Sequence, residues 1–422
     1  MFSENGRPRV VITGIGVISS LGHTAEESWQ SLLNGRSGIG LITQFDSSEL
    51  PVHIAGEVKD FDPTAYMDFK EARRVSRASQ LAVAATKMAL EDAGLDAPLD
   101  NVERVATIVG TGAGGLEVAD HQLDRLRNKG FRQVSPFAMV GFLANMPAYH
   151  LSVLTGARGH INTVVAACAS GTQAIGEALD VIRNGRADMA IAGGVEGLIH
   201  ESAIAGFAAM RALSLRNDDP QQACRPFDRL RDGTVISEGA GFVILERLDH
   251  ALARGAKIRT ELLGYAASSD AFHISMPDPQ ASGAVNAMRW ALEDAKLNTG
   301  DLHYINAHGS ATTLNDAMET LAIKKLFGER AYGIPVSSSK AVLGHALGAT
   351  GAIEAIFASY ALSEQIVPPT WNYEEPDPEC DLDYVPNEPR AMRIDTALTN
   401  SFGMGGQNAC LVLKRISHNG EG

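Results

Sequence analysis

The sequence predicts an α/β protein built from two similar halves, each with a mostly parallel or mixed sheet covered by helices. Short runs of Val, Ile and Ala bounded by Gly alternate with helical patterns in the first part of the chain. The same order of patterns starts again after about residue 255. We therefore expect a first half at 1–255 and a second half at 256–422, with a functional site where they meet.

The elements of the first half follow from local patterns. The segment 8–22, PRVVITGIGVISSLG, is typical of a buried strand that runs into a turn. The next segment, 23–35, HTAEESWQSLLNG, has the cap and the apolar spacing of a helix that ends at Gly. The same strand-and-turn pattern recurs in three further segments, the second of which precedes a predicted helix at 172–185: 105–115, 161–171 and 187–197.

The second half repeats these patterns. RTELLGYAASSDA at 259–271 is similar to the first strand and its turn, and HYINAHGSATT at 303–313 is similar to VATIVGTGAGG. The strongest similarity pairs 164–182 with 336–362, since each has a strand, a polar turn, small residues and a long Ala-rich helix. This pairing places Cys168 and His345 in related turns of the two halves.

Composition limits the classes of function. The chain has 36 Lys and Arg against 50 Asp and Glu, and this net charge of -14 argues against general nucleic-acid binding. The four cysteines lie far apart without a CxxC pair, so we expect no disulfide framework and assign no metal. No apolar run reaches membrane-spanning length. We expect a cytoplasmic protein with a disordered tail at 417–422.

Cys168 lies between a predicted strand and a predicted helix, with small residues on both sides that permit a sharp turn. A thiol at a helix N-terminus meets the positive end of the helix dipole, which favours the thiolate. The adjacent amide groups can donate hydrogen bonds to an oxyanion. The alternative is a buried structural cysteine, because free Cys is among the most buried residue types.

Two histidines stand in comparable positions. His308 follows the apolar run HYINA, so we expect it at the end of a strand. His345 lies between Gly344 and Gly348, just before a predicted helix. For either histidine alone a structural role is the simpler interpretation. Together with Cys168 on a third turn, they indicate nucleophilic catalysis.

A glycine-rich loop near the C-terminus completes the pattern. Gly403, Gly405 and Gly406 lie between a polar entry and a final apolar strand. Such a loop permits close backbone approach and could supply an amide N–H to the same site, although a plain connecting turn is the alternative. It is not a dinucleotide fingerprint, because a strand rather than a helix follows it.

With Cys168, His308, His345 and the FGMGG loop in this order, the chain closely resembles the elongating, synthase II-like β-ketoacyl-acyl carrier protein synthases of the thiolase superfamily. The likeness covers nearly the whole chain and includes ALSLRNDDPQQACRPFDRLRDG and SDAFH. It implies a thiolase-like fold, a five-layer αβαβα sandwich of duplicated βαβαβ halves, and a dimer. It implies no permanently bound cofactor, since acyl carrier protein delivers the substrates on its phosphopantetheine arm.

The resemblance also implies a mechanism for fatty-acid biosynthesis. Cys168 would accept an acyl group as a thioester, and His308 and His345 would polarise the malonyl thioester carbonyl while carbon dioxide leaves. The resulting carbanion would attack the acyl group in a Claisen condensation. The backbone N–H groups of Cys168 and Met404 would hold the oxyanion, and the product would be a 3-ketoacyl thioester two carbons longer.

Further residues receive roles from the resemblance alone. Lys340 and Glu319 would complete the catalytic set by ordering the histidines and nearby water. Ser310 and Thr312 would bind the amides of the phosphopantetheine arm.

A basic cluster falls where the family presents a basic rim to its acidic carrier protein: Lys70, Arg73, Arg74 and Arg211. A solvated surface is the plain alternative. In a chain of net charge -14, such a cluster would steer an acidic partner.

Two positions depart from the family pattern. The glycine loop commonly reads FGFGG, and this chain keeps Phe402 but has the more pliable Met404 at the second aromatic position of the substrate pocket. Thr234 stands in DRLRDGTV at a pocket position that is often aromatic. These changes leave a second assignment open, the ketosynthase subunit of a type II polyketide or polyene pathway, which would pair with a chain-length-factor-like partner instead of a second copy.

Three other functions are alternatives to a condensing enzyme. A thiolase would need a second cysteine in the C-terminal glycine loop, and Cys410 instead belongs to the following predicted strand. An inactive partner subunit would lack the nucleophile, whereas Cys168 and both histidines are present. A cysteine hydrolase of acyl thioesters would release a free acid, and a condensing enzyme would release carbon dioxide and a longer thioester.

Overall fold

The computed structural model describes residues 6–416, and the tail for which we expected disorder lies outside them. Ten strands of the described residues lie side by side in one continuous hydrogen-bonded series. In space they follow one another as β10 (Val336–Ser337), β9 (Tyr304–Asn306), β13 (Thr396–Gly403), β14 (Gln407–Arg415), β8 (Thr260–Ser269), β1 (Val10–Ser19), β7 (Gly239–Arg247), β6 (Met189–Glu196), β4 (Val105–Gly110) and β5 (Ile161–Val164).

The strand pairing shows the duplication. In the first half, β1–β7 and β7–β6 are antiparallel, and β6–β4 and β4–β5 are parallel. In the second half, β8–β14 and β14–β13 are antiparallel, and β13–β9 and β9–β10 are parallel. Order and direction agree strand for strand, which confirms the duplicated α/β fold. The predicted boundary at 255/256 falls between α9 (Leu248–Ala253) and β8 and stays a prediction.

The two halves are joined edge to edge over a short stretch. Three residue pairs connect β1 with β8, from Val10–Leu262 to Ile12–Thr260. Beyond this stretch β1 continues only beside β7, and β8 continues only beside β14. The strands therefore form two five-stranded sheets that separate and enclose helices.

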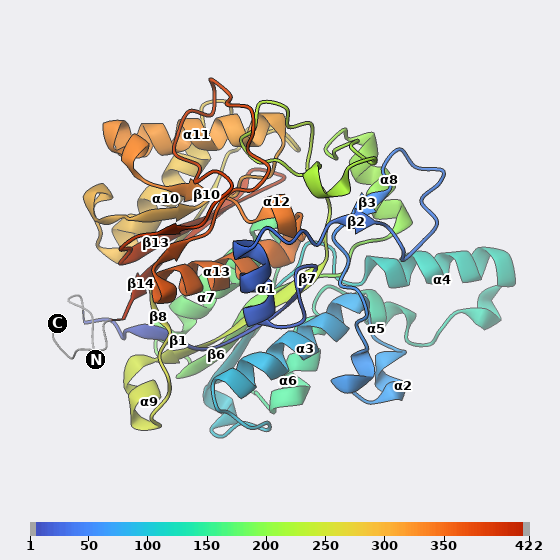
Figure 1. Cartoon of the computed structure of the whole chain (residues 1–422). Coiled ribbons are helices and arrows are strands. Elements are labelled where there is room, and N and C mark those ends of the chain that lie inside the picture. Colours follow the sequence, from blue (N-terminus) through green and yellow to red (C-terminus); the bar gives the residue numbers. More distant parts are fainter. Residues whose placement is uncertain (1–5, 417–422) are drawn as a thin grey trace.

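The helices complete the five layers that the resemblance implied (Figure 1). The central layer holds α7 (Ser170–Arg183) and α13 (Thr350–Glu364), each of which packs against strands of both sheets. The first sheet is covered on its outer face by α3 (Arg77–Asp92) and α6 (Met146–Thr155). The second is covered by α10 (Ser282–Ala295), with α11 (Thr313–Phe327) packed beside it.

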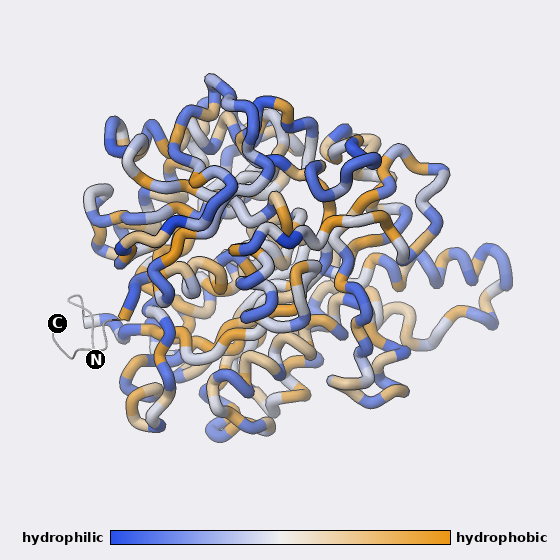
Figure 2. Tube along the Cα trace, in the orientation of Figure 1, coloured by the Kyte–Doolittle hydropathy of each residue, from blue (hydrophilic) through white to orange (hydrophobic). Residues whose placement is uncertain are grey.

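α13 is buried on every side because both of its faces meet a sheet, whereas α7 keeps one polar side with Glu177 and Asp180. In α13 every residue from Thr350 to Leu362 is buried, as expected for a helix without a solvent face. Figure 2 shows apolar chain along the strands near the centre, whereas hydrophilic and apolar segments alternate along the outer helices and loops. None of the helices within residues 6–416 is long and apolar enough to cross a membrane.

The first predicted strand-turn-helix unit is confirmed. β1 is buried along its whole length and leads into α1 (Ala25–Leu33). The Thr24 side chain caps this helix by accepting a hydrogen bond from Glu27 N. The chain leaves the helix through Gly35 at a φ of +66°, a conformation that glycine adopts without strain.

The two central helices begin with the same turn. The 3-10 turn η4 (Ala167–Ala169) precedes α7, and η8 (Leu347–Ala349) precedes α13. The first residue of each turn has a positive φ, +49° at Ala167 and +45° at Leu347. We call these two turns the first and second elbows. The predicted relation holds, although Cys168 corresponds to Gly348 by position and His345 lies three residues before Gly348.

Candidate active site

Cys168, His308 and His345 converge at the junction of the two halves. Cys168 lies in the first elbow, His308 follows β9, and His345 precedes the second elbow. The Cys168 Sγ atom lies 3.1 Å from His345 Nε2, and the two imidazole rings are 5.3 Å apart at 78°. All three residues are buried. The structure thus brings the three residues together where the two halves meet, which is where we expected a functional site.

His345 is held by its backbone and by one hydroxyl. Its N–H donates to Val235 O at 2.7 Å, and its carbonyl accepts from Ser237 N at 2.9 Å. Its Nδ1 atom lies 3.0 Å from Thr350 Oγ1 at the start of α13. A hydroxyl can donate or accept, so this partner supports either neutral tautomer of the imidazole.

His308 is positioned mainly through its backbone. The buried Glu319 carboxylate accepts from the amides of His308 and Gly309, at 2.9 and 2.8 Å, and from Asn400 Nδ2 at 3.1 Å. The Lys340 ammonium donates to the His308 carbonyl from the other side. Lys340 and Glu319, placed by resemblance, therefore both touch the His308 segment.

Lys340 is itself fully buried and is paired with Glu354, which is also fully buried. The Nζ–Oε1 distance is 2.7 Å, and Ser339 Oγ donates to the same oxygen at 3.0 Å. A buried ammonium needs such a partner, because an isolated charge would be too costly to desolvate. The pair fixes a positive charge beside the two histidines.

Both histidines are neutral near pH 7. Burial lowers the pKa of His308 and of His345 well below 6.5, and the Lys340 ammonium lowers both further. A neutral imidazole can donate one N–H to a carbonyl oxygen without carrying a charge. Burial raises the pKa of Glu319 to about 7, while its hydrogen bonds from Gly309, Asn400 and His308 lower it.

The prediction that its position before a helix favours the thiolate form of Cys168 is wrong for the free protein. Burial raises the pKa of the Cys168 thiol to about 11, and this effect exceeds the lowering by Lys340 and by the Met404 amide. The thiol is therefore protonated at neutral pH. Its deprotonation requires a base in contact with it, and His345 Nε2 occupies that position.

The predicted oxyanion donors lie at the thiol. The backbone N–H groups of Met404 and Cys168 both lower the pKa of the Cys168 thiol, which places them against its sulfur. Met404 lies between β13 and β14, and a Cβ at Gly403 would come within 3.2 Å of Cys168 N. The absence of that Cβ allows the glycine loop to approach the first elbow closely.

A cavity of about 380 Å³ opens onto these groups. Cys168, His308 and His345 line it together with all five predicted substrate-binding residues, namely Thr234, Ser310, Thr312, Phe402 and Met404. The Ser310 and Thr312 hydroxyls lie 3.0 Å apart. The Phe402 ring lies 5.9 Å from the His308 ring.

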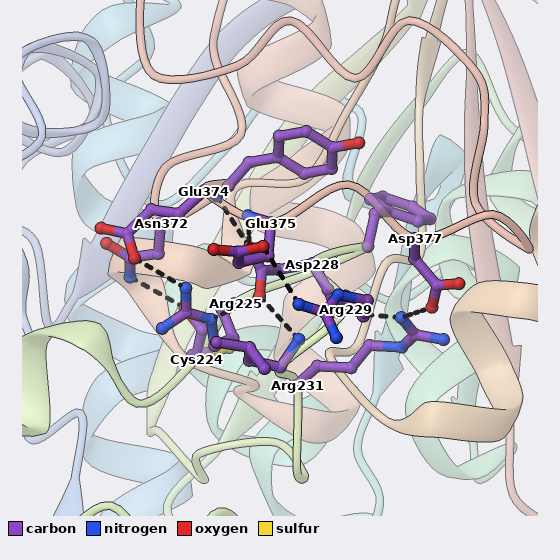
Figure 3. Close-up of polar contacts among 12 residues, drawn as sticks. Cys224, Arg225, Asp228, Arg229, Arg231, Asn372, Glu374, Glu375 and Asp377 are labelled. Carbon is purple, nitrogen blue, oxygen red and sulfur yellow. Dashed lines mark hydrogen bonds and ion pairs between the residues drawn. The ribbon is translucent and has the colours of Figure 1, made fainter.

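The cavity wall that contains Thr234 is anchored by a network of ion pairs (Figure 3). Buried Asp228 accepts from Arg225 Nε at 2.9 Å and from the amides of Glu374 and Glu375 at 2.7 Å. Arg231 pairs with Asp377 at 2.5 Å. These contacts fix the segment just before Asp232, Gly233 and Thr234, which form the wall.

Comparison with known proteins gives the family. A model described as "Beta-ketoacyl synthase, N-terminal domain" matches residues 7–251, and one described as "Beta-ketoacyl synthase, C-terminal domain" matches residues 259–374. The chain belongs to the β-ketoacyl synthase family. The family predicted by resemblance is thereby confirmed.

Individual relatives agree with this family. A Synechocystis sp. protein named 3-oxoacyl-[acyl-carrier-protein] synthase 2 is 49% identical over 97% of this chain and 98% of its own. A β-ketoacyl synthase structure from Burkholderia phymatum has a TM-score of 0.91 at 36% identity and covers 97% of this chain and 100% of that chain. A type II polyketide ketosynthase, solved with its acyl-carrier protein and bound to a hexaketide, has a TM-score of 0.89 at 33% identity with the same coverage.

The four basic residues expected to contact a carrier protein are all exposed. Arg211 lines the active-site cavity, whereas Lys70 and Arg74 line a second cavity of about 720 Å³ beside α2 (Phe69–Ala72). Arg73 caps α2. Within residues 6–416 none of the four forms an ion pair, so their charges are available to a partner.

Several residues that shape this synthase-family site carry no obvious signal in the sequence. Thr350, the Nδ1 partner of His345, and Glu354, the partner of Lys340, lie in an otherwise apolar helix. An acidic residue in the middle of a buried helix is the one signal that could have identified Glu354 as a paired group. Asn400 supports Glu319 from within β13.

The remaining thiols are separate from the site. Cys410 lies in β14, as the sequence predicted, and its thiol donates to Asn400 Oδ1 at 3.1 Å.

The three site residues could also hold a metal ion. The ligand atoms of Cys168, His308 and His345 lie within 4.8 Å of one another and form a donor set that zinc accepts. A metal ion there would occupy the nucleophile.

Proposed function

We propose that this chain is a 3-oxoacyl-acyl carrier protein synthase of fatty-acid biosynthesis that performs a decarboxylative Claisen condensation. The observation that carries the proposal is the contact of Cys168 Sγ with His345 Nε2 at 3.1 Å, with the neutral His308 in the same cavity. The name of the Synechocystis relative supports the same activity.

In the first step, an acyl group moves to Cys168. The thiol gives its proton to His345 Nε2 while sulfur attacks the thioester carbonyl, and His345 returns the proton to the departing pantetheine thiolate. The protonated state of the free thiol makes this coupled transfer necessary. The Thr350 hydroxyl at Nδ1 accommodates the change in imidazole protonation.

In the second step, the malonyl thioester loses carbon dioxide. N–H groups of His308 and His345 donate to its carbonyl oxygen, which takes up the negative charge of the enolate as the C–C bond breaks. Neutral imidazoles suffice, and their low pKa values keep them neutral across the physiological range. Lys340 and Glu319 act through His308 by fixing its backbone.

In the third step, the enolate carbon attacks the acyl group on Cys168. The amide N–H groups of Cys168 and Met404 hold the tetrahedral oxyanion, which collapses to expel the Cys168 thiolate. The 3-ketoacyl thioester leaves, and the thiolate takes up a proton. Atoms and charge balance as one acyl thioester, one malonyl thioester in its carboxylate form and one proton from solvent giving the product, carbon dioxide and a free thiol.

The cavity fits a substrate that arrives on a long arm. We assign Ser310 and Thr312 to the amides of the phosphopantetheine arm, and Thr234, Phe402 and Met404 to the acyl chain. The proposal requires only the phosphopantetheine arm that delivers the substrate, and it assigns no permanently bound cofactor.

The proposed location is the cytoplasm, because all four cysteines are free thiols, which a reducing compartment maintains.

The proposed protein partner is acyl carrier protein. Lys70, Arg73, Arg74 and Arg211 supply exposed positive charge that forms no ion pair within residues 6–416 and could meet an acidic carrier. A Lys70→Glu/Arg74→Glu variant should raise the KM for carrier-bound substrates with little change in kcat, and the defect should shrink as salt rises. An unchanged KM would remove these residues from the interface.

The proposed assembly is a homodimer formed along β5. This strand lies at one end of the strand order, so one of its edges has no partner strand within residues 6–416. Exposed apolar side chains lie on it and beside it: Ile161 in the strand itself, Val165 directly after it, and Tyr149 and Val153 on α6. Native mass spectrometry distinguishes the dimer from a monomer that gains activity only with a chain-length-factor-like partner.

A type II polyketide or polyene ketosynthase is the second candidate. The polyketide ketosynthase structure covers this chain equally well, but at 33% identity against 49% for the synthase 2 relative. Met404 and Thr234 in the pocket are the observations that favour it. Primer preference separates the two candidates, because a fatty-acid enzyme extends saturated acyl chains and a polyketide enzyme extends poly-β-keto chains.

The test supplies a panel of acyl-carrier protein thioesters, followed by malonyl-carrier protein. We expect carbon dioxide and a 3-ketoacyl thioester two carbons longer, with saturated primers preferred. Release of a free acid without carbon dioxide would instead identify a thioester hydrolase. No product with any primer would overturn the proposal.

A further inference from the structure

A buried carboxylate lies between the two elbows and has no part in the proposed chemistry. Glu196 is the last residue of β6 and is fully buried. Its Oε2 atom accepts from Gly112 N at 2.7 Å and Gly348 N at 3.0 Å. Its Oε1 atom accepts from Ala113 N and Thr111 Oγ1, both at 3.2 Å. Glu196 therefore joins the loop after β4 in the first half to the second elbow.

The loop after β4 is also tied to the first elbow. Ser170 Oγ, at the start of α7, lies 3.2 Å from Thr111 O and 2.7 Å from Ala167 O. The same hydroxyl accepts from Ala166 N at 2.8 Å. A continuous set of hydrogen bonds thus runs from the backbone around Cys168 through Thr111 to Glu196.

On the other side, the bond to Gly348 reaches the segment that holds His345. Gly348 lies two residues before Thr350, whose hydroxyl contacts His345 Nδ1. The two elbows approach backbone to backbone. A Cβ at Gly348 would lie 2.5 Å from Gly112 N, and a Cβ at Gly171 would lie 2.7 Å from Gly348 O.

We propose that Glu196 is a positioning residue that holds the His345 elbow against the Cys168 elbow and so sets the distance between Cys168 Sγ and His345 Nε2. Four donors from two halves of the chain meet at one side chain, and only a group that accepts without donating satisfies all of them. The inference rests on the proposed function, in which this distance controls proton transfer from the thiol.

Glu196 also acts on the thiol through its charge. Its carboxylate raises the pKa of Cys168, whereas the Lys340 ammonium lowers it. Burial raises the pKa of Glu196 to about 7, so Glu196 is ionised in the alkaline range where Cys168 titrates. Among the other acidic groups nearby, Glu117 is coupled to both Glu196 and Glu238.

The test uses two variants, each of which removes a different property of the Glu196 side chain. Glu196→Gln keeps the length but turns an amide NH₂ toward the donors and removes the charge. Glu196→Asp keeps the charge but shortens the reach. Both should lower the kcat of condensation by about 10- to 100-fold with the KM for the carrier-bound primer nearly unchanged, because small misplacements of reacting groups are costly.

A second readout separates positioning from general damage. The rate at which iodoacetamide alkylates Cys168 is measured against pH. In Glu196→Gln the midpoint should move to lower pH, because the charge that raises the thiol pKa is gone. In Glu196→Asp the midpoint should stay near that of the wild type. A general loss of structure would not shift the midpoint in one variant and leave it unchanged in the other.

Glu117→Gln is the matched control. Glu117 is a buried carboxylate that accepts from Arg77 N. This variant should keep the wild-type kcat. If Glu196→Gln does not fold, Thr111→Val removes one donor and should give a smaller loss of kcat in the same direction.

Two results would overturn the proposal. One is a folded Glu196→Gln variant, or a folded Thr111→Val variant where the former does not fold, whose kcat matches the wild type. The other is an alkylation midpoint that does not move in folded Glu196→Gln. Iodoacetamide requires no natural substrate, so the alkylation profile tests Glu196 even if wild-type protein fails to condense any primer. That failure would refute the proposed function instead.

Discussion

In the first half, the turn before α7 has Cys168 as its second residue, whereas the equivalent turn before α13 in the second half has Gly348. The backbone is alike in both, with φ values of +49° at Ala167 and +45° at Leu347. The first elbow presents a thiol to the cavity. The second presents no side chain at this position and donates its N–H to Glu196.

This difference shows how a duplicated fold acquires an asymmetric site. A thiol at the second elbow would collide with the loop after β4 and with Glu196, because a Cβ at Gly348 has no room there. The glycine allows that close contact, and the second half contributes its chemistry from other positions, His345 before the elbow and His308 after β9. In the proposed mechanism the first half then supplies the nucleophile, and the second supplies the imidazoles.

The largest expected effect comes from a side chain at Gly348, where the second elbow meets the loop after β4 and Glu196. In Gly348→Ala the added Cβ would lie 2.5 Å from Gly112 N and 2.9 Å from Glu196 Oε2. The second elbow must shift and take His345 with it. We expect a loss of stability of about 1–3 kcal/mol from overpacking and a fall in kcat of about 100-fold, measured by denaturant unfolding and by the condensation assay.

Gly206→Ala is the matched control for this substitution. Gly206 lies in α8 (Glu201–Ala209), and a Cβ there meets nothing within 4 Å. This variant should be as active as the wild type and up to about 1 kcal/mol more stable, because Ala favours helix over Gly. Equal activity in both alanine variants would show that the elbow contact does not matter.

A second prediction sharpens the role of the second half. Lys340→Met removes the ammonium that lowers the pKa of both histidines, so these pKa values should rise. The neutral imidazole is lost as pH falls through its pKa. The acid limb of malonyl decarboxylation should therefore move to higher pH, measured as carbon dioxide release from pH 5 to 8.

Stability provides the control for Lys340. The single variant leaves Glu354 as an unpaired buried carboxylate, which should cost about 3–5 kcal/mol at neutral pH. In Lys340→Met/Glu354→Gln most of that stability should return, while the shifted pH profile should remain. A double variant with the wild-type profile would contradict the assigned effect of Lys340 on the histidines.

The smallest predicted effect concerns the loop of the second half that reaches the first elbow. Met404→Phe should narrow the range of accepted primers, because a rigid ring replaces a pliable side chain in the cavity wall. We expect changes in relative kcat/KM below about tenfold. Met404→Leu, in which the side chain has a similar volume, should keep the wild-type primer preference. An unchanged primer preference in Met404→Phe would show that Met404 fills the cavity wall without influencing which primers are accepted.

Much of the fold could be predicted because its signals are local. Apolar runs bounded by glycine marked β1, β4 and β6, and their recurrence after residue 255 revealed the duplication. Cys168, His308 and His345 could be grouped because each lies on a turn after a predicted strand and beside small residues, and because a site was expected where the two halves meet. The resemblance supplied Lys340 and Glu319.

The rest depends on tertiary contacts that a single sequence does not display. Helix position suggested a favoured thiolate at Cys168, but the burial that raises its pKa to about 11 comes from both halves. The contact of Glu196 with Gly348 spans 152 positions and joins a strand of the first half to the turn before α13 in the second half. The exact alignment of the elbows, Cys168 with Gly348, needed the backbone angles.

The most direct test of the central claim measures the two half-reactions separately. Intact-protein mass spectrometry follows the acyl adduct, and carbon dioxide release follows decarboxylation of malonyl-carrier protein, in Cys168→Ala and His308→Ala. We predict that Cys168→Ala forms no adduct but still releases carbon dioxide, and that His308→Ala forms the adduct while release falls by at least about 100-fold. An adduct in Cys168→Ala, or undiminished carbon dioxide release in His308→Ala, would contradict the claim that Cys168 of the first half accepts the acyl group and His308 of the second half supports decarboxylation.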